Sequence, residues 1–75
     1  MLKKKLTSDE MKTVFKMADC DMKISEVARE LFAHRNTIIY RIERIKKKTG
    51  YDIRRFYDLA ILLREVGFGM WGEFE

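Results

Sequence analysis

The chain contains no proline, and no glycine occurs before Gly50. Proline and glycine are the residues that most strongly disfavour a helix interior, so most of the backbone carries no strong helix breaker. No stretch alternates between apolar and polar side chains cleanly enough to predict a half-buried strand. The sequence therefore predicts an all-α fold in which helices are connected by short joints.

The chain has 75 residues and a mass of 9.0 kDa, which is enough for one domain. We expect a single domain over residues 1–75, with a helical core at 6–66 and a tail at 67–75. Met1 and a capped first helix favour a complete protein.

The residue types exclude several functional classes. One cysteine and one histidine leave no internal disulfide and no Cys/His zinc site. No nucleophile–base set or convergent carboxylate pair is present, so we expect no catalytic residue, no metal and no cofactor, and the chain is not predicted to be an enzyme. No apolar run of about 18 residues could span a membrane, and no apolar signal core follows the basic N-terminus. The expected compartment is the cytoplasm.

Local signals predict four helices, near 8–18, 25–32, 35–48 and 53–66. The first begins with a capping box, in which Thr7 is the N-cap and Glu10 returns a hydrogen bond. Leu6 and Met11 occupy the positions of a hydrophobic staple. The apolar stripe of this helix is expected at Met11, Val14, Phe15 and Ala18.

The other helices have weaker boundary signals. Ser25 is the expected N-cap of the second helix, Gly50 should end the third in a left-handed conformation, and Asp52 can cap the fourth. The inner face of the second helix is expected at Val27, Ala28 and Leu31. The core stripe of the fourth is expected at Phe56, Leu59, Ala60, Leu63 and Val66, which leaves Tyr57, Ile61 and Leu62 outside it.

The second and third helices are separated only by Phe32, Ala33 and His34. Two helices joined this tightly must cross steeply, and the small Ala28 suits the crossing point. This is the helix-turn-helix pattern.

The third helix has two different faces. At 3.6 residues per turn, its core stripe consists of Ile38, Ile42 and Ile45. The opposite face carries polar side chains that hydrogen-bond base edges and phosphates: Asn36, Thr37, Tyr40, Arg44 and Lys47. Arg41 lies beside the core stripe, where its stem can pack while its guanidinium reaches a phosphate.

Positive charge is concentrated in the same region. Residues 35–55 carry eight lysine and arginine residues against two acidic ones, although the whole chain has a net charge of only +4. A local basic block indicates a polyanion-binding face. A solvated helix surface is the alternative interpretation.

The motifs of this region resemble the C-terminal DNA-binding domain of PucR-type regulators, which are bacterial activators of purine and sugar-diacid metabolism. The similar residues are Val27-Ala28-Arg29-Glu30-Leu31, His34-Arg35-Asn36-Thr37, Tyr40-Arg41, Arg44-Ile45 and Thr49-Gly50 with Asp52. The resemblance covers roughly residues 20–66. More distantly, the chain is similar to the factor-for-inversion-stimulation helix-turn-helix.

The resemblance implies sequence-specific binding of double-stranded DNA by a transcription regulator of the bacterial cytoplasm and nucleoid, with helix 35–48 in the major groove. The site residues it implies are His34, Arg35, Asn36, Thr37, Tyr40, Arg41 and Arg44, and the charge pattern adds Lys47. The chain departs from the family in lacking the large sensory domain, so no small-molecule effector site is evident. It also has Ile39 at a basic family position.

Several of these residues have a second interpretation. Asn36 can read adenine or help to cap its helix, and His34 fits a joint or cap position better than a ligand. Thr37 suits a phosphate near the helix N-terminus, whereas Tyr40 can be partly packed.

The tail is rich in aromatic residues and glycine, and it suits a homodimer interface. The residues expected at that interface are Ile61, Leu62, Phe68, Met70, Trp71 and Phe74. Two recognition helices related by a dyad read half-sites about 34 Å apart. The alternative is that the tail folds back onto helix 53–66.

A second function remains open. The chain could be a protein-interaction module that keeps the helix-turn-helix fold without binding DNA, with the tail as its active surface. RNA binding is a weaker variant, because the fold offers no aromatic platform on a sheet.

Overall fold

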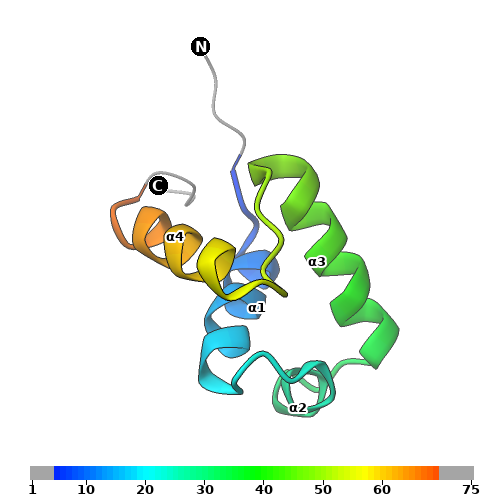
Figure 1. Ribbon diagram of the computed structural model, residues 1–75. Helices are drawn as coiled ribbons and strands as arrows, with labels where there is room; N and C mark the ends of the chain where they lie inside the picture. Colours follow the sequence, from blue (N-terminus) through cyan, green and yellow to red (C-terminus); the bar gives the residue numbers. More distant parts are fainter. Residues whose placement is uncertain (1–4, 70–75) are drawn as a thin grey trace.

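The computed structural model describes residues 5–69, which form four helices and no strand. The helices are α1 (Ser8–Asp19), α2 (Ile24–Glu30), α3 (Arg35–Thr49) and α4 (Phe56–Gly67). This confirms the predicted all-α, four-helix architecture. Figure 1 shows α1 in the middle of the molecule, with α3 and α4 on opposite sides of it. No described helix is long and apolar enough to cross a bilayer.

The predicted capping box starts α1. The Thr7 hydroxyl accepts a hydrogen bond from the Glu10 backbone N–H at 3.1 Å, and the Glu10 carboxylate accepts one from the Thr7 N–H at 3.0 Å. Leu6, the preceding residue of the predicted staple, is fully buried.

The buried face of α1 differs from the predicted stripe. Val14 is buried as expected, but Phe15 is 45% exposed and Ala18 is exposed, while Thr13 and Met17 are buried. Thr13 tolerates burial because its hydroxyl donates to the Asp9 carbonyl at 2.9 Å. α1 packs against α2, α3 and α4, and these contacts bury the face that carries Thr13, Val14 and Met17. The spacing of apolar residues in the sequence does not distinguish this face from the one with Phe15 and Ala18.

The start of α2 also differs from the prediction. Ser25 lies inside the helix, and Lys23 is the N-cap without a side-chain hydrogen bond. Asp21 and Met22, in the turn before α2, have positive φ angles of 54° and 63°, and the N-cap lies two residues earlier than predicted. Val27 and Ala28 are buried as predicted.

Gly50 ends α3 with φ 82°, as predicted. Asp52, however, does not cap a helix, because α4 begins only at Phe56 after Arg55 as N-cap. The Asp52 carboxylate instead accepts from the Arg54 backbone N–H at 3.0 Å and stabilises a turn. Ile53, in this turn, is fully buried in the core.

The buried face of α4 differs from the predicted core stripe. Leu59 and Leu62 are buried, whereas Phe56 and Ala60 are exposed. Among the described helices, α4 packs against α1 alone, so only a narrow stripe of it is covered. Leu62 belongs to this protomer's own core and is therefore not available to the predicted dimer interface.

One apolar core unites the four helices, the segment before α1 and the loop between α3 and α4. Its members are Leu6, Val14, Met17, Val27, Ala28, Ile38, Ile42, Ile45, Ile53, Leu59 and Leu62. In the predicted tail, Phe68 is exposed, and Met70, Trp71 and Phe74 lie outside the described residues.

Candidate nucleic-acid interface

The two faces of α3 are divided as the sequence predicts. Ile38, Ile42 and Ile45 are fully buried against the rest of the domain. Asn36, Tyr40, Arg44 and Lys47 are exposed, and Thr37 is partly buried. Tyr40 is 60% exposed, so it does not pack into the core. The polar face of α3 is therefore open to a partner.

The joint before α3 fixes the start of this helix. His34 is the N-cap, and its Nδ1 accepts a hydrogen bond from the Asn36 backbone N–H at 3.0 Å. Phe32 takes a left-handed conformation with φ 53° and is 96% exposed. The Ala33 N–H donates to the Ala28 carbonyl at 2.9 Å, which ties the joint to the end of α2. Figure 1 shows α2 nearly end-on at the bottom of the view, connected by the joint to the lower end of α3.

The side chain that caps α3 belongs to His34 and not to Asn36. His34 caps α3, and the side chain of Asn36 makes no hydrogen bond to any residue of the described range 5–69. Arg35 is exposed and likewise makes no ion pair within that range. The first turn of α3 thus presents a guanidinium and an amide to solvent.

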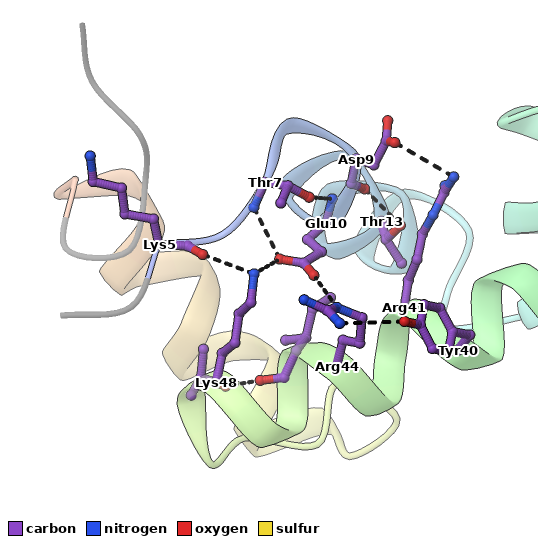
Figure 2. Close-up of polar contacts among 11 residues, drawn as sticks. Lys5, Thr7, Asp9, Glu10, Thr13, Tyr40, Arg41, Arg44 and Lys48 are labelled. Carbon is purple, nitrogen blue, oxygen red and sulfur yellow. Dashed lines mark hydrogen bonds and ion pairs between the residues drawn. The ribbon is translucent and has the colours of Figure 1, made fainter.

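Two acidic residues at the start of α1 face the middle of α3 (Figure 2). Glu10 Oε2 lies 3.2 Å from Arg44 Nε, and Glu10 Oε1 lies 2.7 Å from Lys48 Nζ. Asp9 Oδ2 lies 3.7 Å from Arg41 Nη2. The sequence pattern predicts Glu10 only as part of the capping box and predicts no role for Asp9. No local motif signals these pairs, because the partners are distant in sequence.

Arg44 also contacts Tyr40, one turn earlier on α3. Its Nη1 donates to the Tyr40 hydroxyl at 3.3 Å, and its guanidinium carbon lies 5.8 Å from the centre of the Tyr40 ring. The hydrogen bonds to Tyr40 and Glu10 raise the pKa of Arg44 above its ordinary value, so the side chain is cationic throughout the physiological range.

A second ion-pair group lies at the other edge of α3. Arg54 Nη2 is 3.0 Å from Glu43 Oε2, and Arg54 Nε is 3.0 Å from Asp52 Oδ1. The Arg54 hydrogen bond lowers the pKa of Asp52 despite partial burial.

The cations of residues 35–55 therefore form two groups, one with ion pairs and one without. Arg41, Arg44, Lys48 and Arg54 are paired, whereas Arg35, Lys46, Lys47 and Arg55 have no ion pair within residues 5–69.

A shallow groove runs between the start of α1 and the outer side of α3. It is lined by Thr7, Asp9, Glu10, Thr37, Tyr40, Arg41 and Arg44. The four lining residues on α3 belong to the predicted DNA-binding site. The other three lie at the start of α1, and the sequence does not predict that they are near this site.

The family model of the PucR C-terminal helix-turn-helix domain matches residues 11–64. The chain belongs to this family. The match spans α2, the joint and α3 of the PucR-type domain, and it confirms the resemblance seen in the sequence motifs. It begins at Met11, so Asp9 and Glu10 lie just outside the matched range. No curated protein and no solved structure matches the chain.

Proposed function

We propose that this PucR-type domain is a transcription regulator that binds double-stranded DNA sequence-specifically, with α3 in the major groove. The observation that carries the proposal is the division of α3, which buries Ile38, Ile42 and Ile45 and exposes amide, phenol, guanidinium and ammonium groups from Asn36 to Lys47. Such groups recognise base edges and phosphates. No enzymatic activity, cofactor or metal is part of the proposal, and a role at the bacterial nucleoid follows from it.

The first turn of α3 is the proposed base-reading part. The N-terminal residues of a recognition helix contact base edges in helix-turn-helix proteins. Asn36 offers to an adenine a side-chain amide that makes no hydrogen bond within residues 5–69, and Arg35 offers to a base or phosphate a guanidinium that makes no ion pair within the same range. Thr37, partly buried beside the N-terminal end of the helix, suits a phosphate, while His34 supports this turn as its cap.

The later turns of α3 are the proposed backbone-contacting part. Tyr40, Arg41 and Arg44 line the groove beside α1, and Lys47 is exposed without an ion pair in the described range. Cations at these positions would add sequence-independent affinity that weakens as salt rises.

We further propose that the domain acts as a homodimer through the outer face of α4. Tyr57, Ile61 and Phe68 are exposed along this face, and the expected interface also includes Met70, Trp71 and Phe74. Because α3 and α4 lie on opposite sides of α1 (Figure 1), an interface on α4 would leave both copies of α3 free.

Titration of a fluorescent random-sequence duplex tests DNA binding. The protein should bind at low salt, and its affinity should fall steeply as salt rises. Arg35→Ala should weaken binding several-fold, because it removes from the first turn of α3 an exposed cation that has no ion pair among the described residues. Lys12→Ala, at an exposed position on α1, should have little effect. A wild-type protein that fails to bind at about 50 mM salt would contradict the proposal.

Failure to bind DNA would favour the second candidate, a protein-interaction module. The observation behind this candidate is the exposed apolar surface of α4, where Phe56 and Tyr57 form an edge-to-face pair with ring centres 5.8 Å apart. Exposed aromatic residues of this kind are common at protein interfaces.

A further inference from the structure

We propose that Glu10 is a positioning residue for DNA recognition: it holds Arg44 in one orientation on the face of α3 and keeps Lys48 away from phosphates. This inference rests on the proposed function. It assigns to α1, through one carboxylate, part of the selectivity that the helix-turn-helix unit is expected to provide.

Glu10 is a buried carboxylate, and both of its oxygens accept hydrogen bonds. Its side chain is only 4% exposed. Oε1 accepts from Lys48 Nζ at 2.7 Å and from the Thr7 N–H at 3.0 Å, while Oε2 accepts from Arg44 Nε at 3.2 Å. Burial raises the pKa of Glu10, but the hydrogen bonds from Lys48, Thr7 and Arg44 outweigh it, and the net pKa lies below the ordinary 4.5. Glu10 is therefore an anion at neutral pH.

The first consequence is a fixed guanidinium. Arg44 is held at two points, by Glu10 through Nε and by Tyr40 through Nη1, yet its side chain is 47% exposed. Figure 2 shows the chain of contacts from Glu10 through Arg44 to Tyr40. A planar group held in this way loses less conformational freedom on binding than a free one. Glu10 thus preorganises two side chains of the proposed site.

The second consequence is a distinction between neighbouring lysines. The Lys48 ammonium donates to Glu10 and to the Lys5 carbonyl at 3.0 Å, and its side chain is only 16% exposed. Lys47 is exposed and has no ion pair among the described residues. Glu10 therefore withholds one lysine from non-specific phosphate contacts and leaves the other available.

Glu10→Gln tests the inference, because glutamine can still accept from the Thr7 N–H in a capping box but carries no charge. The matched control is Glu30→Gln, which removes the same charge from an exposed pair with Lys16 at 3.4 Å. Two probes are needed: a duplex that the wild-type protein selects from a random pool, and a random-sequence duplex.

In Glu10→Gln, the ratio of affinities for the selected and random duplexes should fall about tenfold relative to Glu30→Gln, because a loose Arg44 no longer fixes the register of α3 on the DNA backbone and a released Lys48 adds affinity for every sequence. The slope of log affinity against log salt should steepen by about 0.9 per protomer for each released cation that reaches a phosphate. A merely structural role for Glu10 would not steepen this slope.

Two further measurements make the test independent of folding defects. In the free wild-type protein and in Glu30→Gln, the Nε–H of Arg44 should be protected from solvent exchange in nitrogen-15 NMR, and Glu10→Gln should lose this protection. Arg44→Lys, which keeps the charge but cannot bridge Glu10 and Tyr40 as a planar group, should lose selectivity while binding the random duplex as tightly as wild type.

The outcomes separate the two proposals. If the wild-type protein selects no duplex, the proposed function itself fails. If it does select one, but Glu10→Gln matches Glu30→Gln in affinity ratio and salt slope, the positioning role is overturned and DNA binding stands. Unchanged selectivity in Arg44→Lys would overturn it equally.

Discussion

At the residue scale, the ionised state of Glu10 makes the stability of the domain depend on pH. The pKa of this carboxyl is below 4.5 in the folded protein, so folded Glu10 binds a proton less readily than unfolded Glu10. Its contribution to the free energy of unfolding is therefore complete above about pH 4.5 and is lost as pH falls through the lowered pKa.

We predict that Glu10→Gln lowers the free energy of unfolding by about 1–3 kcal/mol at neutral pH, because hydrogen bonds to a charged group are lost. The difference from wild type should shrink as the pH falls below about 4.5, measured by urea denaturation at several pH values. Glu30→Gln, at an exposed ion pair, should change stability little at any pH. A Glu10→Gln difference that stayed constant down to about pH 3 would contradict this explanation.

At the element scale, α1 provides a direct test of which helix face is buried. Met17 is fully buried, whereas Phe15 is 45% exposed. Met17→Ala should lower the free energy of unfolding by about 2–5 kcal/mol, because it leaves a cavity in the core. Phe15→Ala should cost about 1 kcal/mol or less. Thermal and urea denaturation of both variants would decide the matter, and a larger loss for Phe15→Ala would restore the face expected from the sequence.

The elements also show which structural features were predictable. The capping box at Thr7 and the left-handed Gly50 were predictable because each is a local backbone requirement. The buried face of α3 was predictable because its isoleucines recur at helical spacing with polar residues between them.

Other features depend on partners distant in sequence. α4 is apolar nearly all round, so its buried face is chosen by contact with α1 and not by its own pattern. Asp52 could cap either a helix or a turn, and its position beside Arg54 and Asp58 selects the turn. The contact of Glu10 with Lys48 joins residues 38 apart in sequence, and no motif encodes it.

At the scale of the whole molecule, α1 separates two surfaces of different chemistry. One side carries the polar and basic face of α3, and the other carries the exposed aromatic and aliphatic residues of α4 (Figure 1). A surface that reads DNA and a surface that joins two copies would not compete for space in this arrangement. The proposed dimer therefore leads to a prediction about mass and a prediction about the DNA site.

We predict that the wild-type protein sediments at micromolar concentration with about twice the 9.0 kDa mass of the chain. Ile61→Glu should restore the single-chain mass, because a carboxylate would be buried without a partner in the apolar interface. Phe32→Glu is the matched control: Phe32 is 96% exposed on the joint before α3, away from α4, and its loss should leave the mass unchanged.

Duplexes selected by the dimer should contain inverted half-sites about one turn apart, and Ile61→Glu should bind them with the affinity of a single half-site. A wild-type mass that stays near 9.0 kDa would assign the apolar face of α4 to a different partner.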